Sequence, residues 1–370
     1  MEPQGDGGGR DILDWLALRL VKGVGSVRYA RLIEAFGSPG AVLAAPEAEL
    51  ARIKGIPPAV AQAIARREFR ADPEAQLARL EKMRARVLTL ADPDYPPLLA
   101  QVYAPPPVLF LRGGLGPCRT GGVALVGSRA ASAYGRRVTG EVARDLARAG
   151  VSVVSGLARG IDSAAHQGAL QGGGHTVAVL GCGLDVAYPP ENTTLVAEML
   201  AAGGAVLTEF PLGTPPAAAN FPVRNRIISG LCRAVVVVEG GLRSGSLITA
   251  RHALDQGREV FAVPGPVGSP GSQGCHHLIR QGARLLSSAR DLLEEGALPP
   301  MGDTPPAAPP PELPPEAARL LELVGPQPVH ADLLCRESGL APQEVTALLV
   351  NLELAGLVQA LPGNNYVRQE

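Results

Sequence analysis

The sequence predicts a doubly wound α/β domain with a Rossmann-like parallel sheet, joined to an N-terminal helical domain and a C-terminal winged-helix domain. Three observations support this prediction. Helical patterns alternate with short apolar runs from Val123 to Ser288. Some runs, such as Val235-Val236-Val237-Val238, are apolar throughout, which is typical of parallel strands buried on both faces. Small and polar residues follow most runs, as they do where parallel strands end at a ligand site.

The α/β domain is expected over residues 113–296. Its predicted strands are 123–127, 151–155, 176–180, 205–209, 234–239, 259–263 and 283–286. Its predicted helices include 134–149, 162–171, 191–202 and 245–256. The preceding segment, 76–112, is Pro-rich in its second half and is expected to be a linker that adds an edge strand at Val108-Leu109-Phe110-Leu111.

Residues 1–75 predict a small helical domain of the helix-hairpin-helix or SAM-like kind. Leu20 to Ser26 leads into a helix over 27–36, and Ile53 to Pro57 leads into a helix over 58–67. In many proteins such a Gly-containing hairpin binds DNA phosphates through backbone N–H groups. The second copy has Pro57-Pro58, which removes two of these donors. A packing domain without a ligand is the alternative.

The C-terminal region divides into a Pro-rich linker, 297–315, and a winged helix, 316–370. Three helices are expected there (316–324, 330–338 and 342–355), followed by two strands around Pro362-Gly363-Asn364-Asn365. The third helix has no Lys or Arg and carries Glu344 and Glu353, so it is unsuited to phosphate. We expect this domain to contact a protein.

Charge is distributed unevenly along the chain. The net charge is −1, yet residues 120–290 carry 15 basic and 10 acidic side chains, and residues 291–370 carry 3 and 12. A basic centre predicts a polyanionic partner. No apolar run reaches the roughly 18 residues that a membrane span needs. The five cysteines are scattered without a Cys-x-x-Cys motif, which fits a reducing cytoplasm.

The predicted strands end in glycine- and arginine-bearing turns. Because parallel strands end at one edge of a sheet, we expect Arg129, Arg159 and Arg243 to meet at a Gly-lined groove. A second cluster at a helix start, Phe221 to Arg226, adds two guanidiniums and an amide, and either Phe221 or Tyr188 is a candidate for stacking on a base. Ion pairs with Asp162, Asp185 or Glu239 are the alternative for any one arginine.

The absence of several sequence motifs reduces the number of ligand classes that this groove could bind. The chain has no Gly-x-x-x-x-Gly-Lys-Ser/Thr, and Val154-Ser155 stands where a ribose-binding acid would end the second strand. ATP and dinucleotide cofactors are therefore disfavoured, as is an esterase, because Gly-x-Ser-x-Gly is missing. Cys275-His276-His277 resembles half of a metal site, but the sequence has no second cluster that would supply the other ligands. His166 is either a histidine that packs in a helix or a general base.

Six motifs together resemble the DNA-processing protein DprA (Smf) family over about residues 95–288. They are Val-Gly-Ser-Arg (126–129), Ser-Gly-Leu-Ala-Arg-Gly-Ile-Asp-x-x-Ala-His (155–166), Leu-Gly-Cys-Gly-Leu-Asp (180–185), Tyr-Pro-x-Glu-Asn (188–192), Phe-Pro-x-Arg-Asn-Arg-Ile-Ile-Ser-Gly (221–230) and Arg-Ser-Gly-Ser-Leu-Ile-Thr-Ala (243–250). The resemblance implies a cytoplasmic protein without catalysis, cofactor or metal. Such a protein would bind and protect incoming single-stranded DNA in natural transformation, bind double-stranded DNA more weakly, and load a RecA-type recombinase.

The resemblance and the turn residues give these expected DNA contacts: Gly127, Ser128, Arg129, Gly156, Arg159, Phe221, Arg224, Asn225, Arg226, Arg243, Ser244 and Ser246. The resemblance also implies a homodimer formed through residues 276–286, with contacts by His277, Leu278, Ile279 and Leu285. One departure is His276, which stands where the family usually has Asn.

The sequence also fits two other functions. The Gly-rich turn after Glu239 resembles, more loosely, the phosphate site of nucleotide-monophosphate glycosidases of the lysine-decarboxylase-like group. In such an enzyme Glu239 or Asp162 would be the acid near the sugar. The other function is a scaffold whose acidic C-terminal region binds a partner.

Overall fold

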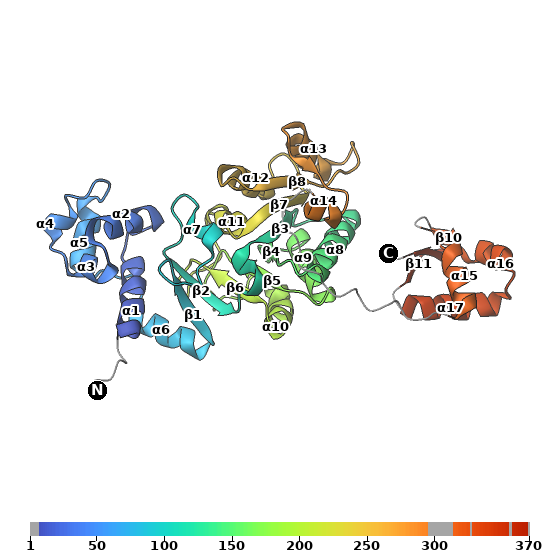
Figure 1. Ribbon diagram of the computed structural model, residues 1–370, viewed down its shortest axis with the longest axis horizontal. Helices are drawn as coiled ribbons and strands as arrows, with labels where there is room; N and C mark the ends of the chain where they lie inside the picture. Colours follow the sequence, from blue (N-terminus) through green and yellow to red (C-terminus); the bar gives the residue numbers. More distant parts are fainter. Residues whose placement is uncertain (1–6, 295–313, 326–327, 355–356, 369–370) are drawn as a thin grey trace. The chain divides into compact units, whose positions relative to one another are not determined.

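The computed structural model describes residues 7–294, 314–325, 328–354 and 357–368 (Figure 1). The chain forms two compact units, residues 1–304 and 305–370. The first unit contains the helical N-terminal region and the α/β sheet, and the second is the winged helix.

A nine-stranded sheet forms the centre of the first unit, in the order β1-β2-β6-β5-β4-β3-β7-β8-β9. The strands are β1 (Ala85–Thr89), β2 (Val108–Gly113), β3 (Gly122–Gly127), β4 (Val153–Ser155), β5 (Thr176–Val179), β6 (Ala205–Thr208), β7 (Cys232–Glu239), β8 (Glu259–Ala262) and β9 (Arg284–Leu285). Strands β3 to β9 are parallel, and all seven predicted strands are confirmed.

Helices cover both faces of the sheet, as the doubly wound prediction requires. One face is covered by α8 (Ala133–Arg148), α9 (Ile161–Gln171), α10 (Thr193–Ala201) and α14 (Ala289–Glu294). The other is covered by α7 (Pro97–Ala100), α11 (Asn220–Gly230), α12 (Gly245–Asp255) and α13 (Gln273–Arg280). Among the described residues, no helix is both long and apolar enough to cross a membrane.

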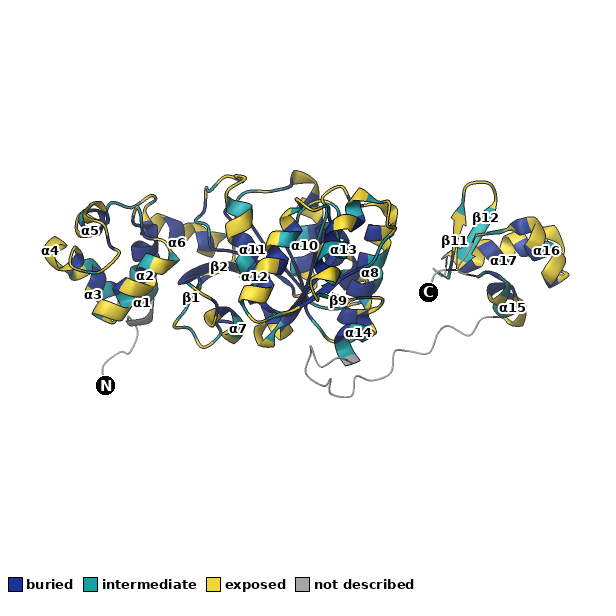
Figure 2. Cartoon of the chain, turned by 90° about the horizontal axis from the view of Figure 1, so that it is seen from above, coloured by how far each residue is buried: buried dark blue, intermediate teal, exposed yellow. Residues whose placement is uncertain are grey.

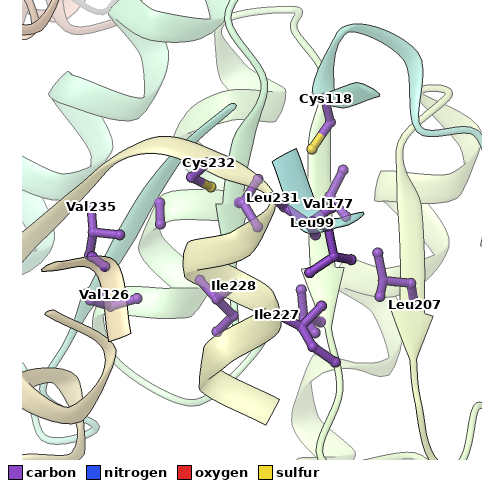
Figure 3. Close-up of a cluster of buried hydrophobic side chains, with 14 of the residues drawn as sticks. Leu99, Cys118, Val126, Val177, Leu207, Ile227, Ile228, Leu231, Cys232 and Val235 are labelled. Atoms are coloured by element: carbon purple, nitrogen blue, oxygen red, sulfur yellow. The ribbon is translucent and has the colours of Figure 1, made fainter. Parts of the chain in front are cut away.

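Alternate residues of each strand fill two cores. Val126, Val177 and Val235 pack on one face against Ile227 of α11 and Leu231, the residue that follows this helix (Figure 3). Their neighbours along the strands point to the other face, so the apolar runs are buried throughout. Figure 2 shows buried strands between helices whose outer faces are exposed.

The expectation for residues 76–112 needs a correction. Val108 to Leu111 does form a strand, but β2 pairs antiparallel with β6 on one side and with β1 on the other, so β1 is the edge. The segment is therefore no plain linker. Ala85–Thr89, predicted as linker, forms a strand in which every residue except Arg86 is buried.

The N-terminal helices share a core with the antiparallel edge of the sheet. They are α1 (Gly7–Leu20), α2 (Ser26–Phe36), α3 (Pro39–Ala44), α4 (Glu47–Leu50), α5 (Pro58–Ala65) and α6 (Pro73–Lys82). Leu32 and Ile64 belong to one buried cluster with Val87 and Phe110 of β1 and β2. The helical region is thus packed on the sheet, and the two predicted hairpin helices are confirmed as α2 and α5.

The second unit has the three predicted helices and a three-stranded sheet. The helices are α15 (Pro315–Leu323), α16 (Ala331–Ser338) and α17 (Pro342–Leu354); the sheet order is β10 (Val329–His330), β12 (Asn365–Arg368), β11 (Val358–Leu361). Leu320, Leu334 and Leu349 are fully buried at its centre. Most of the predicted linker, 297–313, lies outside the described residues.

Candidate nucleic-acid interface

A cavity of about 530 Å³ lies at the carboxyl ends of β3 and β7. The direction of strand order reverses between these two strands, because β4 follows on one side of β3 and β7 lies on the other. Doubly wound sheets bind ligands at such a switch point. The cavity is lined by the turn after β3, the turn after β7 and the first turns of α11 and α12.

The turn after β3 is held by backbone bonds and close packing. The Ser128 N–H donates to the Glu239 carbonyl oxygen (2.8 Å), and the Ser128 carbonyl oxygen accepts from the Ile161 N–H (3.2 Å). A Cβ at Gly127 would lie 2.6 Å from Ile161 Cγ1, so only glycine fits there. The turn therefore presents Arg129 outward from a fixed base.

Arg129 and Phe221 form the rim of the cavity. The Arg129 guanidinium lies 4.9 Å from the Phe221 ring centre, and the ring centre of Tyr188, in the loop between β5 and α10, lies 5.7 Å from that of Phe221. Arg129 is exposed, and within the described residues it forms no ion pair. A cation over an aromatic ring, open to solvent, is suited to one phosphate and one stacked base.

Arg224 forms the floor of the cavity. It is 4% exposed, and its Nη1 donates to the carbonyl oxygens of Gly156 (2.8 Å) and Val179 at the ends of β4 and β5. Burial lowers the pKa of Arg224 to about 10, so the guanidinium stays protonated at neutral pH. A Cβ at Gly156 would lie 2.5 Å from Arg224 Nη2, which explains the glycine.

Arg224 follows Phe221 by three residues, so both side chains lie on one face of α11. Arg226 lies two residues further and is on the opposite face, since a helix turns about 100° per residue. It donates to Glu209 Oε2 (2.7 Å) and to the Ala104 carbonyl oxygen (2.8 Å). The structure thus corrects the prediction that Arg226 joins the cavity.

The turn after β7 supplies hydroxyls and a helix start. Ser244 caps α12 by accepting from the Ser246 N–H, and the two side-chain oxygens lie 2.8 Å apart. Both serines and Asn225 line the cavity. The N-terminus of α12 adds the positive end of a helix dipole there.

Two predicted arginines lie on other parts of this surface. Arg159 forms an ion pair with Glu191, an acid that the sequence analysis had not matched with it. Arg243 is exposed on the turn after β7, beside the cavity rather than in its lining, and has no ion pair within the described residues.

The cavity also has lining residues that the sequence analysis missed. They are mainly apolar or small: Ala158, Pro222, Ile228, Ile248 and Thr249. The spacing of residues along the helices is the sequence signal that could have identified two of these lining residues. Ile228 follows Arg224 by four residues, and Thr249 follows Gly245 by four, so each lies on the cavity face of its helix.

The acids considered for catalysis are held in structural bonds. Glu239 Oε2 accepts from the Ser132 N–H (2.9 Å) and hydroxyl at the start of α8, outside the cavity lining. Asp162 lines the cavity but is buried, accepts from the Ala158 N–H, and has its pKa raised by burial. His166 is fully buried, with its Nδ1 hydrogen-bonded to Thr176 Oγ1 (2.7 Å), and burial lowers the pKa of His166 to about 3. No observation here favours the glycosidase hypothesis.

Metal-binding side chains are not grouped in the described part of the chain. No set of three or more His, Cys, Asp or Glu residues is placed there to hold an ion. Cys275 is buried, and the neighbouring His276 is hydrogen-bonded through Nε2 to the Gly265 carbonyl oxygen (3.0 Å). The histidine at this departure from the family pattern thus fixes the turn after β8.

The predicted dimer residues lie on α13 and β9, at the open edge of the sheet. Leu285 is 51% exposed, whereas His277 and Ile279 are half-buried. Leu278 is 7% exposed and packs into the sheet core. This placement corrects the prediction for Leu278, because its side chain faces the chain's own interior.

Fold and cavity define the class: a Rossmann-like α/β protein with a cationic, aromatic-rimmed cavity at its switch point, followed by a winged helix. The profile of the family described as DNA recombination-mediator protein A matches residues 86–297, and that of the DprA winged helix domain matches residues 304–364. The chain therefore belongs to the DprA (Smf) family.

Individual relatives agree with this assignment. The chain is 46% identical to protein Smf of Escherichia coli (strain K12) over 308 residues, 80% of each chain. It is similar to the X-ray structure of DNA processing protein A from Streptococcus pneumoniae, with TM-score 0.66 and 40% identity, covering 76% of this chain and 97% of that one. For Helicobacter pylori DNA processing protein A, described by its single-stranded DNA binding mode, the TM-score is 0.51 and the identity 28%, covering 57% and 95%.

Proposed function

We propose that this protein binds single-stranded DNA in the cavity between β3 and β7 and acts, in the cytoplasm, in the processing of DNA taken up by natural transformation. The observation that carries the proposal is the exposed Arg129 guanidinium over the Phe221 ring at the rim. Cation and ring match the two chemically distinct parts of a nucleotide, its phosphate and its base.

A single strand fits this arrangement better than a duplex does. Stacking on Phe221 or Tyr188 needs a base whose face is free, and bases in a duplex are stacked on their neighbours. Double-stranded DNA would offer the rim only its phosphates, so it is expected to bind there more weakly.

The DNA contacts that we propose form two groups. Arg129, Phe221, Ser244 and Ser246 would contact the strand, together with the exposed Arg243 beside the cavity. Arg224 and Gly156 would form the floor beneath the DNA. The buried guanidinium supplies a fixed positive charge and joins the ends of β4 and β5. We assign no reaction to the cavity, because the acid in its lining, Asp162, is buried and already bonded within the protein.

Two protein contacts belong to the proposal as well. A second copy of the chain would pair at the α13–β9 edge, where Leu285 is exposed. A RecA-type recombinase would be loaded onto the bound strand, and the winged helix is the region we assign to protein contact, since its third helix carries no Lys or Arg.

The test is a titration of labelled single-stranded and blunt double-stranded oligonucleotides at two salt concentrations, with light scattering for the mass of the free protein. We expect tighter binding of the single strand and a steep loss of affinity with salt, because neutralised phosphates release counterions. Equal affinities for both forms would contradict the cavity as a single-strand site. A monomer mass at micromolar concentration would contradict the proposed dimer contact but not the DNA site.

A further inference from the structure

We propose that the N-terminal helical region carries a second nucleic-acid site, one for the phosphate backbone of duplex DNA. The site consists of the two hairpins of that region and the cations around them, which we call the hairpin surface: Lys22, Arg28, Arg31, Arg52, Lys54, Arg66, Arg67 and Arg70. This inference goes beyond the single-strand cavity and does not depend on it.

The two hairpins have the same local structure. Gly23 and Gly55 both take the left-handed backbone conformation, with φ of +83° and +85°. Lysine precedes each glycine, and each hairpin leads into a helix, α2 or α5. Since Pro57 and Pro58 remove backbone donors from the second hairpin, side-chain cations must supply most of the binding there.

Helix α2 joins the two hairpins into one surface. Arg28 Nη1 donates to the Gly23 carbonyl oxygen (2.6 Å), and one turn later Arg31 Nη1 donates to the Lys54 carbonyl oxygen (3.3 Å). A Cβ at Gly23 would lie 2.7 Å from Val60 Cγ2, so the first hairpin packs directly on α5. The two hairpins are therefore fixed relative to each other.

The three arginines of residues 66–70 lie beside the first hairpin. The Lys22 N–H donates to the Glu68 carbonyl oxygen (3.1 Å), and the Arg70 N–H donates to the Leu20 carbonyl oxygen (2.9 Å). These bonds place the segment 66–70, with its three arginines, next to the Lys22 turn.

The charge of the hairpin surface is mostly uncompensated. Residues 20–70 contain 8 basic and 4 acidic side chains, a net charge of +4. Among the described residues, the one ion pair that involves these cations joins Lys22 to Glu68 at 3.9 Å, with both side chains exposed. Such a pair contributes little, so it leaves the cations available for phosphate.

The aromatic residues of this region decide between the two forms of DNA. Tyr29 is 1% exposed, and among the described residues no arginine lies over the ring of Phe36 or Phe69, so residues 20–70 have no counterpart of the Arg129–Phe221 pair at the cavity. A rigid surface with many cations and no such cation–ring pair fits the regularly spaced phosphates of a duplex.

The hairpin surface is separate from the cavity. Arg226 Nη2 donates to Ser26 Oγ (3.4 Å) at the start of α2, and Arg226 lies on the face of α11 opposite the cavity residue Arg224. A duplex at the hairpin surface and a single strand in the cavity would therefore lie on different sides of α11, and both could be bound at the same time.

The experiment compares two triple variants of the full chain. Lys54→Gln/Arg66→Gln/Arg67→Gln changes exposed cations of the hairpin surface, and Lys82→Gln/Arg112→Gln/Arg148→Gln changes the same number and kind of exposed cations elsewhere. The probe is a labelled blunt duplex without single-stranded ends, titrated over a range of salt concentrations.

We expect the hairpin variant to lose duplex affinity by on the order of tenfold or more, and the slope of log affinity against log salt to fall by about 2 to 3. The control variant should keep most of both, and single-strand affinity should change little in either. Saturating unlabelled single strand should leave the duplex bound to the wild-type protein. Equal losses in both variants, an unchanged slope in the hairpin variant, or full displacement by single strand would each overturn the proposal.

Discussion

The rim and the floor of the cavity both carry arginine, yet the two arginines do different work. Arg129 at the rim is exposed and touches an aromatic ring, whereas Arg224 at the floor is 4% exposed and bonded to two strand-end carbonyl oxygens. A cation that is open to solvent can exchange its water for phosphate. A cation already bonded to the backbone contributes to folding and acts on a ligand only through its charge.

This difference separates two kinds of experiment. Changes at the floor should lower the free energy of unfolding, and binding should fall with it. Changes at the rim should lower DNA affinity and leave stability alone. Equal losses of stability and of DNA affinity at the floor and at the rim would contradict this difference.

The largest effect is expected for Arg224→Met, which fills similar volume without the charge. It leaves the carbonyl oxygens of Gly156 and Val179 without their donor and leaves Asp162 buried without its neighbouring cation. The free energy of unfolding should fall by about 3–5 kcal/mol, measured by urea denaturation. Arg224→Lys is the matched control, because it keeps the charge and should recover part of this loss. A loss below about 1 kcal/mol for the methionine variant would contradict the structural role.

The buried residues near the floor should also make the stability of the protein sensitive to acid. His166 lies fully buried near Arg224, and its pKa is about 3 in the folded protein against 6.5 for the free side chain. Between these values the unfolded chain binds the extra proton, so the contribution of His166 to stability falls as pH drops below 6.5, by about 1.4 kcal/mol per pH unit.

The variant His166→Gln removes this titration. Its unfolding free energy should therefore fall less than that of the wild type between pH 6.5 and about pH 4.5, by roughly 2–3 kcal/mol. Urea denaturation at several pH values measures the difference. Parallel curves for the two proteins would show that His166 is protonated in the folded state.

At the rim, Phe221→Leu should lower single-strand affinity by about 1–3 kcal/mol, because the stacking ring is lost while apolar volume is kept. Stability should change by less than about 1 kcal/mol, since the ring is only half-buried. Fluorescence anisotropy with a single-stranded oligonucleotide measures the affinity. Tyr188→Leu is the comparison. If only Tyr188→Leu lowers the single-strand affinity, the base stacks on Tyr188 and not on Phe221.

The sheet was predictable because its signal is local. Alternation of apolar runs with helical patterns gave all seven parallel strands, and the turn at Gly127 to Arg129 follows directly from a strand end. Strand β1 was missed because it is short and the exposed Arg86 interrupts its apolar run, although Val87 and Leu88 are buried on opposite faces.

The site was predictable in residue type but not in side-chain direction. Arg224 and Arg226 look equivalent in the sequence, yet helical phase sends one to the cavity and the other to Glu209. Arg159 meets Glu191 across 32 residues, and such a partner can be found only once the turns are placed in space. Leu278 likewise faces the core because of its phase on α13.

The most direct test of the cavity as a single-strand site is the affinity of Arg129→Gln for a single-stranded oligonucleotide over a range of salt concentrations, with Arg148→Gln as an exposed control on α8. We predict that affinity falls, that the slope of log affinity against log salt drops by about 0.7 to 0.9, and that the unfolding free energy stays within about 0.5 kcal/mol of the wild type. Arg148→Gln should behave as the wild type does. If Arg129→Gln keeps both the affinity and the salt slope of the wild type, the strand does not bind at this cavity.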